Sequence, residues 1–361
     1  GATIRPSGRG LLQVIAGAEN LFQIIGVLSV VSWLLASCSY QERRALLIRV
    51  LNLYVILLAF HSLLVLYGVV FNQSALFEPF LPAAGERGST VWERAAGLGR
   101  FTGIFGQPLE AGTAYSLGLI AIVAFWNSLP TRKALKACIA VLLVIGGSLS
   151  VSKVFIFGGI GIALWLVLRA AFQRALGVAK LILGTALVFP LVPHLLPILP
   201  GGSRLARLFD SRYLSEVGYL RVLTANRFGS TESSLARIAR PVLAESPWSG
   251  LGFGAGEVYD SAYLEIFVQG GFFALFIYLV VLLTVAYFVW FQISDRHIAL
   301  FGRSLVVFTV LAGIGAPMLT QNRVSIVYVT LLGFMISLHP YRRKLVPRRS
   351  MAGGTLERIK T

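Results

Sequence analysis

The residues most able to do chemistry lie in one long stretch, residues 200–262, which carries seven arginines, six carboxylates and no lysine. The arginine guanidinium is planar, stays charged and presents a fork of donors that matches phosphate oxygens. The sequence therefore predicts a phosphate or pyrophosphate site in this stretch. The alternative for any single arginine is an ion pair with a carboxylate of the same stretch, or contact with lipid head groups.

Two of these arginines, Arg237 and Arg240, are three positions apart in a segment that reads as a helix. A start rich in serine and threonine with Glu232, followed by apolar residues, is typical of a helix N-terminus. The two guanidinium groups then share one face and can grip two phosphoryl groups. Pro241 is expected to end or kink this helix at Arg240. Pairing of the arginines with Glu232 and Glu245 is the competing interpretation.

A glycine-rich turn at 247–256 follows, and Asp260 comes after it, just before the next apolar run. The turn lacks the Gly-Lys-Ser/Thr of a P-loop and no strand–helix unit surrounds it. Its predicted role is to turn the backbone tightly back toward the membrane. Asp260 has two interpretations: it caps the next helix, or it acts as a general base at the bilayer surface.

Three further charged residues stand near expected membrane boundaries. Lys153 ends a short turn at 148–153, where it either extends its ammonium toward water or binds an anionic head group. Arg100 and Glu110 flank the point where the chain enters the membrane again, and a carboxylate in an apolar stretch must be paired or hydrated. The two cysteines lack any metal-ligand spacing, so we expect no disulfide framework, no metal and no cofactor.

Composition indicates what must position these residues. Of 361 residues, 56% are hydrophobic and 13% are charged, whereas soluble domains carry about 25% charged residues. This excludes an ordinary soluble enzyme and a disordered chain, and it predicts an all-α, polytopic membrane helix bundle forming one domain over 1–361. About nine stretches approach the roughly 20 apolar residues of a spanning helix. They are 21–40, 50–70, 104–128, 137–150, 154–172, 178–199, 266–292, 300–319 and 324–339.

Basic residues gather in alternate connections between these stretches and in the tail 340–361, which predicts that this side faces the cytoplasm. The net charge of +17 then reports orientation, and nucleic-acid binding is not expected. The two long connections, 71–103 and 200–262, fall outside, where long connections usually carry function. Nine spans also place the N-terminus outside. Further spans upstream, or an interfacial helix at residues 10–20, would accommodate this.

Several of these segments resemble, in the same order, the motifs of the O-antigen ligase and O-antigen polymerase superfamily of bacterial membrane glycosyltransferases. Residues 99–108 resemble an Arg-x-x-Gly-x-Phe-x-x-Pro block, and 149–153 resemble a block that usually contains Ser-Arg-Gly. Residues 233–254 resemble the Arg…Pro-Leu-x-Gly-x-Gly block of the large outer loop. Residues 260–271 resemble the block that opens the next spanning helix. The resemblance covers about 90–340.

Two positions depart from the family pattern. Lys153 stands where the family has arginine, which keeps the charge and loses the bidentate geometry. Asp260 stands where the ligase branch has histidine, which favours the polymerase branch. The resemblance implies a GT-C-like bundle of about a dozen helices. It also implies metal-independent polymerisation of undecaprenyl-diphosphate-linked repeat units into O-antigen, capsule or exopolysaccharide, at the periplasmic face of the bacterial inner membrane.

Within that resemblance Asp260, Arg237 and Lys153 are the expected catalytic residues, and a single displacement predicts inversion at the sugar carbon. The residues expected to contact the pyrophosphate or glycan are Arg240, Arg212, Arg221, Arg100 and Tyr263. Expected partners are the lipid-linked glycan, membrane lipids, a flippase and a chain-length regulator. The alternatives are a ligase that transfers glycan to lipid A core or protein, a lipid-linked oligosaccharide flippase, and a structural subunit of an export complex.

Overall fold

The computed structural model describes residues 11–71, 77, 95–96, 99–172, 234–252, 261–316 and 322–338. Within these ranges every regular element is a helix and no strand occurs, which confirms the all-α prediction. Four of the helices are long and apolar enough to cross a membrane, and three apolar helices are shorter. The lengths and composition of the helices thus support a membrane protein.

The described helices follow the predicted apolar stretches in eight of nine cases. They are α1 (Leu11–Ala36), α2 (Tyr40–Val70), α4 (Pro108–Ala124), α5 (Lys133–Leu149), η2 (Val154–Ile160), α6 (Gly161–Phe172), α12 (Ser234–Glu245), α13 (Ala262–Tyr287), η5 (Phe288–Gln292), α14 (Arg296–Gly313) and α15 (Asn322–Ser337). The one remaining stretch, 178–199, lies outside the described residues, as do the tail 340–361 and most of both long connections. The nine-span count therefore stays a prediction.

The start of α2 differs from the predicted boundary at residue 50. A capping box begins the helix ten residues earlier: the Ser39 side chain accepts from the Glu42 backbone N–H, and the Glu42 carboxylate accepts from the Ser39 backbone N–H. These bonds satisfy orphan donors of the first turn. Arg43 and Arg44 consequently stand on the first turns of a helix instead of in a connection. At the N-terminal side, α1 is one continuous helix from Leu11, so residues 11–20 form no separate interfacial helix.

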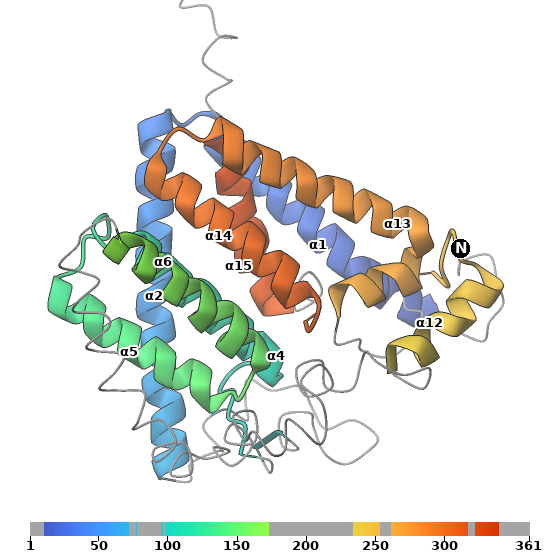
Figure 1. The fold of residues 1–361 in the computed structure, drawn as a ribbon, viewed down its shortest axis with the longest axis horizontal. Helices are drawn as coiled ribbons and strands as arrows, with labels where there is room; N and C mark the ends of the chain where they lie inside the picture. The colour runs from blue at the N-terminus through green and yellow to red at the C-terminus, as the bar shows by residue number, and fades with distance from the viewer. Residues whose placement is uncertain are drawn as a thin grey trace, which may run out of the picture.

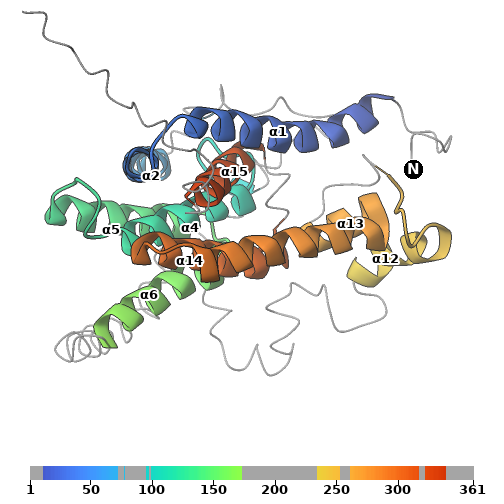
Figure 2. The ribbon, with the colours of Figure 1, turned by 90° about the horizontal axis from the view of Figure 1, so that it is seen from above.

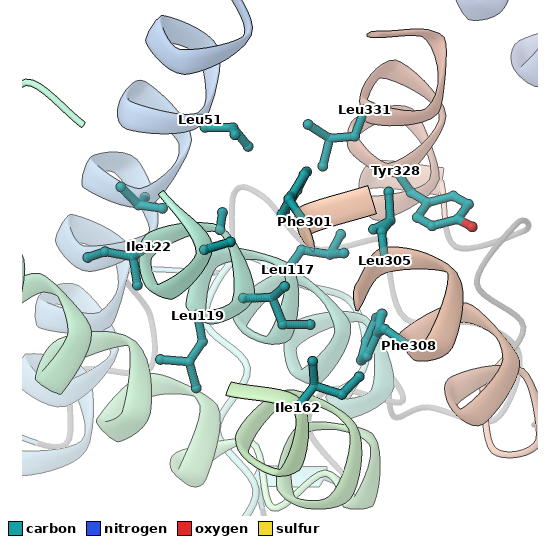
Figure 3. Close-up of a cluster of buried hydrophobic side chains, with 14 of the residues drawn as sticks. Leu51, Leu117, Leu119, Ile122, Ile162, Phe301, Leu305, Phe308, Tyr328 and Leu331 are labelled. Carbon is teal, nitrogen blue, oxygen red and sulfur yellow. The ribbon is translucent and has the colours of Figure 1, made fainter. Parts of the chain in front are cut away.

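The core of the bundle is built around α4, whose residues are almost all buried. This helix packs against α2, α5, η2, α6, α14 and α15. Figure 3 shows Leu117, Leu119 and Ile122 of α4 surrounded by side chains from those neighbours, among them Phe301 and Phe308 of α14. A helix that is apolar on all sides is either a core helix or a membrane span. Helix α4 is buried in the core, whereas the more apolar α13 is mostly exposed.

Glycines let the helices around α4 approach closely. A Cβ at Gly147 would lie 2.3 Å from the Phe155 ring, and one at Gly159 would lie 2.5 Å from Ser116 Oγ. Such small residues allow backbone approach in membrane bundles. The turn between α5 and η2 is thereby pressed against the start of α4.

The bundle has two distinct ends. At one end the Arg44 Nε–Asp295 Oδ2 pair, 2.7 Å apart, joins the start of α2 to the start of α14. Arg43 donates to the Ser337 carbonyl at the end of α15 at 2.7 Å, and His297 Nδ1 lies 3.3 Å from the Ala124 carbonyl at the end of α4. We call this the basic end. Figures 1 and 2 show α2 and α14 leading away from it, with α1 on one face of the bundle and α13 on another.

Candidate functional site

A break in α13 organises the end of the bundle opposite the basic end. Gly271 has φ 65° and ψ −160°, which is not a helical conformation. The helical hydrogen-bond ladder is interrupted there, so donors after the break and acceptors before it need other partners. A left-handed φ is accessible to glycine without steric cost, which explains why a glycine occupies this position.

The turn at 246–252 supplies those partners through four backbone hydrogen bonds. Beyond the break, the N–H groups of Phe272 and Phe273 donate to the carbonyls of Pro247 and Trp248, at 2.9 and 3.2 Å. Before the break, the carbonyls of residues 268 and 269 accept from the N–H groups of residues 251 and 252, at 2.7 and 2.9 Å. We call this paired structure, residues 246–252 with 268–273, the clasp. It joins the glycine-rich turn directly to Gly270-Gly271.

Glycine is required on both sides of the clasp. A Cβ at Gly250, whose φ is +64°, would lie 2.6 Å from the backbone nitrogens of Gly270 and Gly271. A Cβ at Gly271 would lie 2.5 Å from the Pro247 carbonyl oxygen. The described part of the predicted glycine-rich turn, residues 247–252, does turn tightly; its direction relative to the membrane stays a prediction. The remainder of that turn, from residue 253, lies outside the described residues.

The helix that carries Arg237 and Arg240 packs against α13 just before the clasp. Val242 of α12 is fully buried among Leu264, Phe267 and Val268 of α13. The helix does not end at Arg240 before Pro241, because α12 runs from Ser234 to Glu245 through this proline. Pro241 itself is exposed, and the next residue, Val242, packs on α13.

The start of α13 is tied to the end of α14. Ser261 is the N-cap: its Oγ accepts from the Leu264 N–H at 3.5 Å and donates to the Gly313 carbonyl at 3.0 Å. The capping role considered for Asp260 therefore belongs to Ser261. Tyr263, predicted to contact glycan, donates its hydroxyl to the Val310 carbonyl at 2.9 Å and places its ring against Gly313.

The turn between α5 and η2 carries Lys153, and its conformation is strained. Val151 has φ 47°, a left-handed value that β-branched residues rarely adopt. Arg100 holds this turn: its Nε and Nη2 atoms each lie 3.4 Å from a carbonyl oxygen, those of Ser150 and Val151. The neighbouring Phe101 N–H donates to Leu149 O at 2.8 Å. Residues 99–108 and 149–153, expected to contribute to one site, are thus in contact.

Lys153 follows the strained turn directly. It is half-buried and forms the N-cap of η2, a π-helix that begins at Val154. Short π-helical segments occur often at functional sites. The conformation of the turn therefore fixes the backbone position of Lys153, near the start of α4.

A buried polar chain lies beneath this turn, and the sequence reasoning missed it. His61 Nε2 accepts from the Ile104 N–H at 3.1 Å, so the neutral ring carries its proton on Nδ1, which faces Tyr115 Oη at 2.7 Å. Gly103, with φ +61°, passes so close that a Cβ there would lie 2.2 Å from His61 Nε2. A lone histidine in the apolar stretch 50–70 was the available signal, because a buried imidazole needs partners.

Glu110 is accommodated as the sequence requires. It is buried in the first turn of α4, where its Oε2 accepts from the Gly106 N–H at 3.0 Å. A carboxylate at a helix N-terminus is favoured by the exposed N–H groups and the helix dipole. Its bond to the backbone shapes the segment between Arg100 and α4.

The structure therefore brings some of the predicted site residues together. Arg100 contacts the turn that leads to Lys153, and α12 is clasped to the start of α13 next to Tyr263. Arg240 is exposed on α12, while Arg237 is placed by its backbone only. Asp260, Arg212 and Arg221 lie outside the described residues. Helix α14 contacts both α13, which carries Tyr263, and η2, which begins after Lys153.

Comparison with known proteins adds no assignment. No protein-family model, no curated protein and no solved structure matches this chain. The likeness to the O-antigen ligase and polymerase superfamily accordingly rests on the sequence motifs and their order along the chain.

Proposed function

We propose that this chain is a membrane glycosyltransferase that polymerises undecaprenyl-diphosphate-linked oligosaccharide repeat units at the periplasmic face of the bacterial inner membrane. The observation that carries the proposal is the clasp. It joins two segments that resemble separate family motifs and are about 20 residues apart, and it does so through the backbone. The same clasp seats the arginine-bearing helix α12 on α13.

A second observation supports the proposal. The other two motif-like segments, 99–108 and 149–153, also meet, through Arg100 and the strained turn before Lys153. Four segments singled out by resemblance thus form two contacting pairs. Strained backbone that its surroundings hold in place is concentrated at functional sites.

The proposed reaction is a single displacement at the anomeric carbon. The bond between that carbon and the pyrophosphate oxygen breaks, and the pyrophosphate leaves with the electron pair. Arg237 and Lys153, with Arg240 nearby, stabilise the charge that grows on this leaving group. Asp260 removes the proton from the acceptor hydroxyl as its oxygen forms the new bond. Inversion at the carbon follows from one direct displacement.

Arginine is suited to this role because its guanidinium stays cationic at every physiological pH. An aspartate of ordinary pKa, about 3.9, is a modest base. The proposal therefore assigns most of the barrier lowering to the cations at the leaving group. The nine spans, the GT-C-like arrangement and the outward position of residues 200–262 belong to the same proposal.

The test is polymer formation from a lipid-linked repeat unit by the reconstituted chain. Arg237→Ala is expected to lower the rate about 10²- to 10³-fold, the range for loss of a transition-state donor. Asp260→Asn is expected to lower it about 10²- to 10⁴-fold, the range for loss of a general base. Arg49→Ala, which removes an exposed arginine near the basic end, serves as the matched control and keeps full activity.

The readout also separates the alternatives. A polymerase lengthens the glycan on its lipid carrier in detergent, where a flippase has no second compartment and makes no longer product. A ligase consumes the donor only when lipid A core or a protein acceptor is added. Near wild-type polymer yield from both site variants would overturn the proposed roles.

A further inference from the structure

An aromatic surface is left uncovered where the 246–252 turn meets α13. Trp248 is 74% exposed, Phe273 is 67% exposed and Phe276 is 65% exposed, and Phe272 is exposed beside them. The Trp248 and Phe272 rings are in edge-to-face contact with centroids 5.8 Å apart, and the Phe273 N–H bonds to the Trp248 carbonyl. Phe276 lies one turn further along the same helix. We call these four residues the outer aromatic patch.

The position of the patch along α13 matches one boundary of a bilayer. Beyond the break at Gly271 the helix continues without interruption, through η5, to Gln292. At about 1.5 Å per residue, the distance from Phe272 to Trp290 is about 27 Å. The hydrocarbon core of a bilayer is about 30 Å thick. The two ends of this segment are thus spaced as the two membrane boundaries are.

The far end of that segment has the features of a boundary. The Arg303 guanidinium lies 5.7 Å from the Trp290 ring centroid and donates to the Trp290 carbonyl at 3.1 Å. Two similar pairs occur on other helices: Lys136 with Trp126 and Arg169 with Trp165. Tryptophan and basic residues gather at membrane–water interfaces. When Trp290 lies at one boundary, the outer aromatic patch lies at the other.

The chemistry around the patch favours lipid over water. The exposed face of α13 continues from the patch as an apolar surface that includes Ile277, Val280 and Leu283. A large exposed apolar surface of this kind marks a membrane or protein contact. Because the patch is continuous with the apolar face of α13, we expect lipid to cover both. Ser249, beside Trp248, is exposed, and so is the side chain of Arg240 on α12. A polar edge beside an indole ring is the pattern of an interfacial anchor.

We infer that the outer aromatic patch is a membrane-insertion surface, in which Trp248 and its phenylalanine neighbours lie among the head groups and upper acyl chains of the outer leaflet. It holds the clasp, and α12 with it, at the membrane boundary. Figure 1 shows α12 at the edge of the molecule beside the start of α13, where such an anchor fixes its height. The inference does not depend on the proposed glycosyl transfer.

The test places an environment-sensitive fluorophore at the patch in proteoliposomes. The background chain carries Cys38→Ala and Cys138→Ala, which remove both free cysteines. Trp248→Cys and, separately, Phe273→Cys are then labelled with a nitrobenzoxadiazole maleimide. Leu283→Cys, on the same helix and 69% exposed, provides the deep-lipid reference. Circular dichroism and gel filtration establish that each labelled chain is folded.

The expected result is a shallow lipid position. Nitroxide placed at carbon 5 of the lipid chain should quench the label at 248 about twofold more than nitroxide at carbon 12, with the reverse order at 283. Aqueous iodide should quench the label at 248 weakly. Strong iodide quenching without lipid quenching would show that the patch stands in water. Protection from every quencher would show that protein covers it. Either outcome, at both 248 and 273, overturns the inference.

Discussion

Glycines in α4 and in its neighbours set how closely the helices around the candidate site approach. A Cβ at Gly112 would lie 2.3 Å from Ser152 Oγ, which is buried beside the strained turn. We predict that Gly112→Ala lowers the free energy of unfolding by about 1–3 kcal/mol, the usual effect of overpacking. The thermal midpoint in detergent micelles measures this.

Gly161 is the matched control for that variant. A Cβ there meets nothing within 4 Å, so Gly161→Ala should leave stability unchanged or raise it by up to about 1 kcal/mol through helix propensity. Equal thermal midpoints for the two alanine variants would contradict the packing assigned to Gly112.

The Arg44–Asp295 pair at the basic end predicts a pH dependence. Partial burial acts to raise the pKa of Asp295, but hydrogen bonds from Arg44, Ile298 N–H and His297 N–H outweigh it, and the net pKa lies below its ordinary value of 3.8. A lowered folded-state pKa means that the carboxylate stabilises the fold above the unfolded-state pKa. That stabilisation is lost as the pH falls through the folded-state pKa.

Asp295→Asn isolates this effect, because asparagine is also a good N-cap but carries no charge. We predict that the wild type unfolds at a higher temperature than the variant at neutral pH. The difference should begin to close near pH 3.8, the ordinary pKa, and close further below it. Thermal midpoints measured across the acid range test this. A constant difference throughout would show that the charge pair does not stabilise the fold.

At the scale of elements, the clasp depends on the break in α13. Alanine at position 271 would need a left-handed φ and would place its Cβ 2.5 Å from the Pro247 carbonyl oxygen. We predict that Gly271→Ala opens the clasp, so that the amides of residues 251, 252, 272 and 273 exchange hydrogen faster by about tenfold or more. Hydrogen-exchange mass spectrometry measures this directly.

Ser249→Ala is the control for the same turn, since this exposed serine contributes only its side-chain bond to Ser246. Its exchange rates at the clasp should match those of the wild type. Because the clasp positions α12, polymer yield should fall with Gly271→Ala and not with Ser249→Ala. Unchanged exchange in Gly271→Ala would mean that the turn does not depend on the break.

The elements were predictable from sequence to different degrees, for physical reasons. Long apolar runs locate helices because only a helix satisfies its own backbone in an apolar medium. Helix ends were less predictable, since α2 begins at a capping box formed by Ser39 and Glu42. Helix α12 continues through Pro241 because Val242 packs on α13. Tertiary packing decides where such a helix ends, and the periodicity of the sequence carries no information about that packing.

The candidate site was also predictable only in part. Residue type indicated the arginines as phosphate ligands, and the family resemblance joined Lys153 and the glycine-rich turn to them in one functional region. They could not indicate that Arg100 would hold the carbonyls of the 150–151 turn, or that Gly271 would break a helix to receive a distant turn. Backbone hydrogen bonds between segments far apart in the chain leave no side-chain pattern in the sequence.

At the scale of the whole molecule, charge separates the two ends of the bundle. Arg43 is buried at the basic end, where it donates to the carbonyls of Cys38 and Ser337 and so caps α1 and α15. Lys136 and Arg303 donate likewise to the carbonyls of Trp126 and Trp290. Cations near helix C-termini are favoured by the helix dipole. The basic residues that orient the chain thus also stabilise helix ends.

This arrangement predicts which end faces the cytoplasm. Cys38 lies in the turn between α1 and α2 at the basic end, and Ser249 lies exposed in the clasp at the opposite end. In a chain carrying Cys138→Ala, we expect a membrane-impermeant maleimide to label Cys38 only in inverted vesicles. With Cys38→Ala and Ser249→Cys added to that background, labelling should occur only in intact spheroplasts.

The two labels together test the orientation without reference to activity. The positive-inside rule places the basic end in the cytoplasm because Lys and Arg in short connections are retained there. This orientation would turn the clasp toward the periplasm, where the substrate of the proposed polymerase would be exposed at the outer leaflet. Labelling of both positions from the same face would contradict the assignment of Cys38 and Ser249 to opposite sides of the membrane. Labelling from the reversed faces would move the clasp to the cytoplasm and remove the physical basis of the proposed polymerase.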